Sequence, residues 1–324
     1  MTKKITVIVT AYNRTNYLDN ALHSLDRQTL AKNLFDVVLV TNFEFNLERY
    51  ANLRIKHIIT EGKDGEFVEK ALLLTNSEII CFLDDDDYYL NMKLERVLSN
   101  FGSRFIYYRH RKMDFLDKSE IQHNRELNRA SRGTITEIRS DSKKPKTLRA
   151  LKMGMNNSTI CVKKEVLTSN LSFISKIPCC IDEALFLLFS YLPGDGLFDS
   201  SALSMYRNTK RDIRASIITE TKALDFYNHA LTYLEGPLIS QYVHFQIVKT
   251  RFKLFLLTNR ETYFPVTNDL TTCFHAALTG LDGINTKITF LQMLTKVHFY
   301  RLSLVIDRLL VKIVLIFRKI QKVL

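Results

Sequence analysis

Two different patterns of apolar and polar positions, one typical of strands and one of helices, alternate along the first hundred or so residues. β-Branched, apolar runs are typical of strands covered on both faces, and they occur at 5–11, 36–41, 55–59 and 78–83. Between them, apolar residues recur at helical spacing in segments 17–25, 67–74 and 94–98. This alternation predicts an α/β fold with a mostly parallel central sheet, in which ligands bind outside the carboxyl ends of the strands.

The predicted secondary structure changes once along the rest of the chain. Further strands are predicted at 105–108, 158–162 and 202–206, and an apolar helix at 184–191 ends at a Leu-Pro-Gly-Asp-Gly stop signal. After about residue 211, long helical patterns dominate. We therefore predict two domains, a nucleotide-binding α/β domain over residues 1–210 and a helical region over residues 211–324.

Composition narrows the class of protein. The chain has 324 residues, of which 46% are hydrophobic, so it can bury a substantial core and is not disordered. Its formal net charge of +12 favours an anionic partner, such as a phosphorylated substrate or a bilayer surface. The five cysteines fit no zinc-binding spacing and indicate a reducing compartment. No signal-peptide pattern and no run of about 18 uncharged apolar residues occurs, so we expect a cytoplasmic protein without a transmembrane span.

Four consecutive aspartates, residues 84–87, directly follow the fourth predicted strand. Adjacent carboxylates repel one another unless a cation or solvent relieves them. Alternate side chains at a strand end lie on one side, so Asp84 and Asp86 can point together. Mg²⁺ and Mn²⁺ take such oxygen ligands, usually together with substrate phosphates. The run therefore predicts a divalent metal site, with a solvated acidic turn as the alternative.

The first predicted strand ends in Thr-Ala-Tyr-Asn-Arg, residues 10–14. A strand end followed by a helix start is a natural place for a nucleotide. Arg14 is suited to hold a phosphate, and Asn13 or Thr15 to cap the following helix. No glycine-rich fingerprint follows, which argues against a dinucleotide site and a P-loop.

Together, segments 5–14, 25–29 and 81–87, followed by Lys93 and Leu94, resemble the family-2 glycosyltransferases of the GT-A fold over residues 3–210. The resemblance implies inverting transfer from a nucleotide sugar with Mg²⁺ or Mn²⁺. It also implies a metal site at Asp86, shared with Asp84. The positions that it implies for nucleotide-sugar binding are Ala11, Tyr12, Arg14, Asn42, Lys63, Asp64, Lys70, Asp84 and Asp85. For Lys63, Asp64 and Lys70, a simple surface loop is the alternative.

Two positions depart from the family's usual pattern. Asn42 stands where the family often has an acidic residue that reads the base, which leaves the base open. Residues 206–211 lack the histidine that often completes the metal site there. We expect Arg207 and Arg211 to neutralise the diphosphate leaving group instead, a task that arginine suits.

An acidic pair, Asp182 and Glu183, begins the predicted helix that runs to residue 191. Transfer to an acceptor hydroxyl needs a carboxylate that takes the proton, and a helix start favours the ionised form. The pair resembles the acidic dipeptide that carries the base in the family, with Asp182 preferred and Glu183 as the alternative. Taken alone, the pair also fits a plain N-terminal helix cap.

Residues 288–324 contain neither glycine nor proline and are predicted to be mostly helical. At helical spacing, four cations fall on one narrow stripe beside a broad aliphatic arc: Arg301, Arg308, Lys312 and Lys319. The pattern favours a helix lying at an anionic membrane surface, with a core helix or a homodimer contact as alternatives. Nucleic acid is not favoured as a partner, since the cations alternate with aliphatic residues and no recognition motif is present.

The sequence thus predicts a glycosyltransferase, peripheral at the inner face of the membrane, that moves a sugar from a nucleotide-sugar donor to a glycan or lipid-linked acceptor. Two alternatives come from other classes of protein. A nucleotidyltransferase also places aspartates on a nucleotide-binding sheet, but it needs a glycine-rich basic loop that segment 10–14 lacks. A non-catalytic membrane scaffold with a transferase-like head would not need its aspartates.

Overall fold

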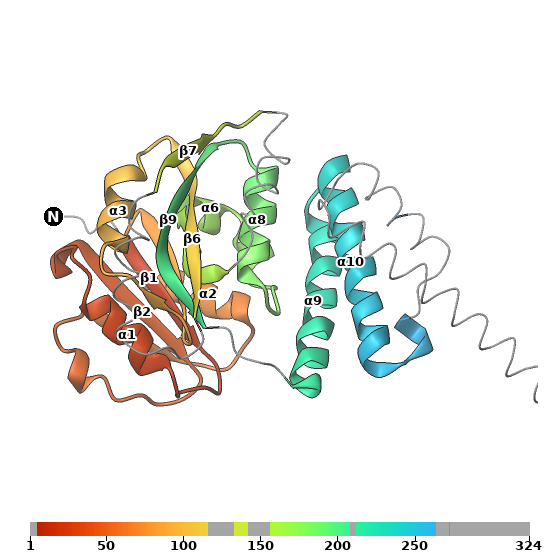
Figure 1. Cartoon of the computed structure of the whole chain (residues 1–324), viewed down its shortest axis with the longest axis horizontal. Coiled ribbons are helices and arrows are strands. Elements are labelled where there is room, and N and C mark those ends of the chain that lie inside the picture. The colour runs from red at the N-terminus through yellow and green to blue at the C-terminus, as the bar shows by residue number, and fades with distance from the viewer. Residues whose placement is uncertain (1–4, 116–132, 142–155, 208–211, 264–271, 273–324) are drawn as a thin grey trace, which may run out of the picture. The chain divides into compact units, whose positions relative to one another are not determined.

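The computed structural model describes residues 5–115, 133–141, 156–207, 212–263 and 272 (Figure 1). By compactness the chain divides into two units, one up to Ser240 and one from Gln241 onward. The first unit contains the sheet and the candidate site. No helix among the described residues is long and apolar enough to cross a membrane.

One sheet of nine strands organises the described part of the first unit. In space the strands follow the order β3-β2-β1-β4-β8-β6-β9-β5, and β7 pairs with β9. Their bounds are β1 Ile5–Ala11, β2 Phe35–Thr41, β3 Ile55–Ile59, β4 Ile79–Asp84, β5 Tyr88–Tyr89, β6 Phe105–Phe115, β7 Ile135–Ile138, β8 Ile160–Lys163 and β9 Asp195–Arg207. The first four strands in space are parallel, as are β6 and β9, whereas β8, β5 and β7 pair antiparallel.

Helices cover both faces of this sheet (Figure 1). They are α1 Leu18–Asp26, α2 Asp64–Leu73, α3 Lys93–Asn100, α6 Lys164–Ser169, α7 Leu171–Ile174 and α8 Ile181–Tyr191. Helix α9 (Ile213–Tyr233) packs on α7, with the ring centre of Tyr233 4.9 Å from that of Phe173. A further helix, α10 (Pro237–Thr258), lies mostly in the second unit. Short 3-10 turns occur at Lys32–Leu34, Glu48–Tyr50, Asn157–Thr159 and Glu261–Tyr263.

Alternate side chains of the central strands build two apolar layers. Val7 and Leu39 pack in one cluster with Leu22 of α1 and Leu94 of α3. Burial of each such side chain contributes about 1.5–3 kcal/mol. The intervening residues, such as Ile8, are equally buried and point to the opposite face of the sheet. Since both faces are covered, the strands are the nearly continuous apolar runs seen in the sequence.

The predicted fold class, an α/β fold with a mostly parallel sheet, is confirmed. Two strands are much longer than predicted, because β6 continues to Phe115 and β9 begins at Asp195. These strands pair with each other over most of their length, with register shifts around His110 and Arg111. Charged side chains within both strands interrupt the apolar pattern, so the sequence revealed only their most apolar parts.

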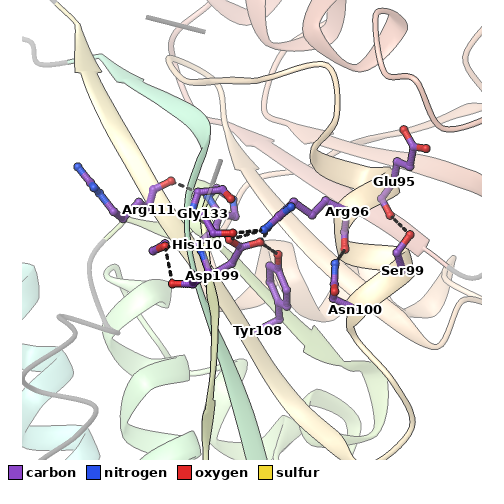
Figure 2. Close-up of polar contacts among 12 residues, drawn as sticks. Glu95, Arg96, Ser99, Asn100, Tyr108, His110, Arg111, Gly133 and Asp199 are labelled. Carbon is purple, nitrogen blue, oxygen red and sulfur yellow. Dashed lines mark hydrogen bonds and ion pairs between the residues drawn. The ribbon is translucent and has the colours of Figure 1, made fainter. Parts of the chain in front are cut away.

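A buried ion pair joins α3 to this long strand pair (Figure 2). The guanidinium of Arg96 donates to the carboxylate of Asp199, with Nε 2.5 Å from Oδ2, and also to the carbonyl of Gly133. The Tyr108 hydroxyl donates to the same carboxylate at 2.7 Å, and the Ser201 N–H donates at 2.9 Å. Burial alone would raise the pKa of Asp199, but these hydrogen bonds together lower it. The cluster fixes α3 on the sheet.

Replacing Tyr108 with phenylalanine is expected to destabilise the fold by about 1.5–3 kcal/mol. The substitution removes one donor to a fully buried carboxylate and leaves the ring in place. Urea unfolding would measure the change in the free energy of unfolding. Ser99→Ala is the control, since this exposed hydroxyl bonds only within α3 and its loss should change stability by less than about 0.5 kcal/mol. Equal stability of Tyr108→Phe and the natural protein would show that the cluster does not hold α3.

Candidate functional site

The carboxyl ends of β1, β2 and β4 meet at one edge of the sheet. The parallel registers pair Thr10 with Asp84 and Ala11 with Thr41, so the three strands end side by side. The four aspartates leave the end of β4 in a tight turn, in which the Asp87 N–H donates to the Asp84 carbonyl at 3.1 Å. The structure therefore brings the aspartate run and the end of β1 together, as predicted.

Arg14 grips two of the four aspartates. Its Nε lies 2.7 Å from Oδ2 of Asp85, and a second bond from the same guanidinium makes the contact bidentate. Another guanidinium nitrogen lies 2.9 Å from Oδ2 of Asp86. Burial raises the pKa of Asp85, and Arg14 offsets part of that rise. The sequence led us to expect Arg14 to contact the nucleotide. The structure shows that Arg14 also orients the acidic cluster.

Asp84 and Asp87 are held by amides. Asn157 donates to Oδ1 of Asp84 at 3.0 Å, and Asn156 donates to Oδ2 of Asp87 at 2.8 Å. Burial and the charge of Asp87 raise the pKa of Asp84 well above its ordinary value. Burial also raises the pKa of Asp87 to about 6, although hydrogen bonds from Asn156 and Ser158 oppose the shift. The half-buried carboxylate of Asp84 and the buried carboxylate of Asp87 are thus close enough for their negative charges to repel each other.

These surroundings fit a divalent cation bound by few protein ligands. The Oδ1 atoms of Asn156 and Asn157 are buried beside the carboxylates and accept no hydrogen bond. A hard cation would relieve the repulsion among Asp84, Asp86 and Asp87. No group of three or more histidine, cysteine, aspartate or glutamate side chains is arranged as a metal site within the described residues. That is compatible with Mg²⁺ or Mn²⁺ held by one or two carboxylates plus substrate phosphates.

The Asp182 carboxylate lies at the start of α8 and is tied to the aspartate cluster. Its Oδ2 accepts the Asn156 N–H at 2.8 Å, and its Oδ1 accepts the Glu183 N–H at 3.0 Å. Burial raises the pKa of Asp182, which the backbone hydrogen bonds oppose. Asn156 therefore connects Asp182 to Asp87, using its backbone for one and its side chain for the other. This residue adopts a left-handed backbone, with φ 73°, which is uncommon outside glycine.

Asn42 at the end of β2 holds the loop that follows β1. Its Oδ1 accepts the Asn13 N–H at 2.8 Å, and its Nδ2 donates to Oδ1 of Asn13 and to Oε1 of Glu61. This pairing supports the left-handed backbone of Asn13, at φ 54°. The predicted cap by Asn13 or Thr15 was wrong, since α1 begins after Tyr17 without a side-chain cap. Asn13 is used to shape the loop instead.

The first turn of α2 packs tightly against the chain that leads to α8. The Gly65 N–H donates to the Ile177 carbonyl at 3.0 Å, and a Cβ on Gly65 would lie 1.9 Å from the Ile174 carbonyl oxygen. Only glycine fits this contact. Asp64, next to it, is close enough for its charge to act on that of Asp182. The Lys63 N–H bonds to Glu66 at 3.3 Å, and the Lys70 ammonium donates to the Thr60 hydroxyl.

Arg207 closes the site from the end of β9. Its N–H donates to Oδ1 of Asp87 at 3.1 Å, and its Nε donates to the Asp86 carbonyl at 3.3 Å. The guanidinium carbon lies 3.9 Å from the centre of the Tyr17 ring. A cation is thus placed beside the aspartate turn, where the sequence predicted one. Arg211 and the tail residues Arg301, Arg308, Lys312 and Lys319 lie outside the described residues.

A buried lysine lies behind the aspartates, and its burial could not be read from the sequence. Lys93 is fully buried, its ammonium donates to the Ser158 carbonyl at 2.6 Å, and it lies 3.3 Å from the centre of the Tyr89 ring. Ser158 in turn accepts the Asp84 N–H at 3.0 Å. Burial lowers the pKa of Lys93 to about 8.

Replacing Lys93 with methionine is expected to change how stability depends on pH. With a pKa of about 8 in the fold and about 10.4 unfolded, the folded state binds fewer protons between these values. The free energy of unfolding of the natural protein should therefore rise with pH in that window relative to the variant. Chemical unfolding at a series of pH values measures this. Lys164→Met is the matched control, since Lys164 also donates to a backbone carbonyl but is only half-buried. If the free energy of unfolding depends on pH in the same way in Lys93→Met and the natural protein, the lowered pKa of Lys93 is contradicted.

Comparison with known proteins gives the class of this fold and site. Solved structures with the same fold include TarS residues 1–349 of S. aureus, with a TM-score of 0.55 and 15% identity over 88% of this chain and 83% of that one. Another is the mannosyltransferase PcManGT of Pyrobaculum calidifontis in complex with GDP-Man and Mn²⁺, with a TM-score of 0.55 and 13% identity over 90% and 86% of the two chains. These likenesses show a GT-A glycosyltransferase fold.

Sequence comparison gives the family. Residues 6–162 match the model of Glycosyl transferase family 2. Over 94 residues, the chain is 33% identical to the poly(ribitol-phosphate) beta-N-acetylglucosaminyltransferase TarS of Staphylococcus aureus. That alignment covers 26% of this chain and only 16% of the relative. Segment 6–162, just under half of the chain, thus matches the family-2 glycosyltransferases, and the resemblance seen in the sequence is confirmed over that segment.

Proposed function

We propose that the chain is an inverting, metal-dependent glycosyltransferase that moves a sugar from a nucleotide-sugar donor to the hydroxyl of a glycan or lipid-linked acceptor. One observation carries the proposal. A buried carboxylate, Asp182, is tied through Asn156 to the aspartate cluster at the same edge of the sheet. A single residue therefore sets the distance between a candidate base and a candidate metal site.

The donor's nucleoside is proposed to lie across the ends of β1 and β2. Tyr12 is 47% exposed, with its ring centre 6.1 Å from that of Phe67, and offers a face for a base. Asn42 stands close by, oriented by Asn13 and Glu61. Relatives with this fold have been solved with UDP, UDP-GlcNAc and GDP-Man, which supports a nucleoside diphosphate sugar as the donor.

The diphosphate is proposed to bind over the aspartate turn. Asp86 and Asp84 would hold Mg²⁺ or Mn²⁺, which as a Lewis acid neutralises charge on the departing diphosphate. Arg207, at the end of β9 and bonded to the same turn, adds a fixed cation without needing a metal. Arg14 keeps Asp85 and Asp86 in place while the diphosphate departs.

Asp182 is proposed to take the proton from the attacking hydroxyl. Its two backbone donors fix the direction of the carboxylate lone pairs, and its raised pKa makes it a stronger base than an exposed aspartate. Attack from the side opposite to the diphosphate would invert the anomeric centre. This requires no covalent intermediate on the protein.

The acceptor is proposed to be presented at an anionic membrane surface, with the protein peripheral at its cytoplasmic face. Support comes from the basic stripe of the tail, at Arg301, Arg308, Lys312 and Lys319, beside a broad aliphatic arc. Sedimentation with vesicles containing anionic lipid measures this. Binding that falls as salt rises is expected, and the absence of binding would remove the membrane from the proposal.

A donor screen tests the proposed activity. UDP-, GDP-, dTDP- and CMP-sugars are tested by thermal shift, each with and without Mn²⁺. A ligand at a hundredfold excess over its dissociation constant raises the free energy of unfolding by about 2.7 kcal/mol. We expect one nucleotide family to produce a metal-dependent shift, which would also name the base that Asn42 leaves open. No shift with any donor would contradict the proposal.

A further inference from the structure

Two adjacent cysteines precede Asp182 with their sulfur atoms in contact. The Sγ atoms of Cys179 and Cys180 are 3.0 Å apart, closer than ordinary van der Waals contact, and both thiols are free. Cys180 is also the residue from which α8 starts, since its carbonyl accepts the Ala184 N–H at 3.0 Å. Its backbone is left-handed, with φ 65° and ψ 47°.

A second thiol pair provides the contrast. Cys81 and Cys161 face each other across β4 and β8, but both are fully buried in the core. An oxidant in solution cannot reach them while the protein is folded. Cys179 and Cys180 are only half-buried, so among the described cysteines they form the pair that solution reagents can reach.

We propose that Cys179 and Cys180 form a reversible oxidation site, which a small disulfide such as oxidised glutathione converts into a disulfide between the two neighbours. In the first step, the Cys179 thiolate attacks one sulfur of the oxidant, forming a mixed disulfide and releasing one glutathione thiolate. In the second, the Cys180 thiolate attacks the Cys179 sulfur and releases the other. The two cysteines lose two protons and two electrons, and the oxidant becomes two molecules of reduced glutathione.

The surroundings set the order of these steps. The hydrogen bond with Cys179 raises the pKa of Cys180 well above its ordinary value, with burial and the charges of Cys179, Asp182 and Glu183 adding to the rise. Cys180 therefore stays a thiol while Cys179 reacts. Once Cys179 carries glutathione, its hydrogen bond to Cys180 is lost, and Cys180 lies next to the sulfur that it must attack.

Closing this bond would act on the candidate base. The new ring contains the peptide bond between the two cysteines and so constrains the Cys180 backbone, whose carbonyl forms the first hydrogen bond of α8. Asp182 lies two residues further on, held by the Asn156 N–H at 2.8 Å. On the proposed function, which this step of the inference rests on, a displacement of the base by about 1 Å lowers transfer on the order of a hundredfold.

Titration with oxidised glutathione, followed by peptide mapping and mass spectrometry, tests the site without any assay of activity. We expect a bond between Cys179 and Cys180, reversed by dithiothreitol. Cys180→Ser should stop at glutathione bound to Cys179, whereas Cys179→Ser should carry none at Cys180. Thiols that both stay reduced, or a bond formed only among Cys81, Cys161 and Cys273, would overturn the proposal.

The effect on the base is read separately, as the transfer rate of oxidised and reduced protein. We expect a reversible loss of activity in the natural protein and no loss in Cys179→Ser under the same oxidant. An oxidised protein that carries the mapped bond and keeps its full rate would overturn the link to Asp182. If reduced protein has no transfer activity at all, the proposed function fails, while the mapping still decides whether the oxidation site exists.

Discussion

Replacing Asp182 with asparagine is expected to lower the sugar-transfer rate by about 10²–10⁴-fold, the usual contribution of a general base. Asparagine is nearly isosteric, so Oδ1 can still accept a backbone N–H, and donor binding should be unchanged. The two parameters to measure are kcat for transfer and the donor's dissociation constant by calorimetry. A fall in kcat with unchanged donor affinity assigns Asp182 to the chemical step.

Glu183→Gln is the matched control, since it removes the neighbouring carboxylate from the same helix turn. It should retain most of the activity. The opposite result, with Glu183→Gln inactive and Asp182→Asn active, would transfer the role of base to Glu183. If neither substitution affects transfer, the base lies elsewhere in the chain.

The pH profile of kcat tests independently whether Asp182 is the base. Asp182 must be ionised to act, and burial raises its pKa above that of an exposed aspartate, about 3.9. Activity should therefore fall as pH drops through a value above that figure. Asp182→Asn should remove this acid limb from any residual activity.

The second large effect is expected for Asp86→Asn, which should weaken Mn²⁺ binding in the presence of donor by on the order of a hundredfold and lower transfer by about 10²–10³-fold. The variant loses a carboxylate oxygen that is proposed to bind the metal, although the Arg14 guanidinium still pairs with Asp85. Titration calorimetry with Mn²⁺ measures the affinity, and removal of metal with a chelator should reproduce the loss of activity in the natural protein.

Asp225→Asn serves as the control for this measurement, because Asp225 is exposed on α9 and away from the aspartate turn. Its metal affinity should match that of the natural protein. Unchanged metal affinity in Asp86→Asn would place the cation elsewhere. Activity that survives complete metal removal would mean that Arg207 and its neighbours neutralise the leaving group alone.

The central part of the fold could be predicted from the sequence because it follows from local patterns. Strand β1 coincides with the predicted run 5–11, and the aspartates follow β4 as expected. Parallel strands must end at one edge, so the position of the site followed as well. The long pairing of β6 with β9 could not be predicted, since Asp199, the ion-pair partner of Arg96 on α3, places a charge inside β9, where sequence patterns expect apolar residues.

Within the site, the residue types were predictable but their connections were not. Nothing local in segment 156–158 indicates that Asn156 bonds to both Asp87 and Asp182. Each of these partners is at least 26 residues away in the chain. The same holds for the pairing of Arg14 with Asp85, 71 residues apart. Only the tertiary fold brings such partners together.

The most direct test of the account is the reaction of the purified protein with the donor that the thermal-shift screen selects. In the presence of Mn²⁺, NMR would follow release of the nucleoside diphosphate together with the anomeric configuration of the transferred or hydrolysed sugar. The account predicts metal-dependent release, a product of inverted configuration and loss of both in Asp182→Asn. Release that is equally fast in Asp182→Asn, or a product of retained configuration, would contradict it.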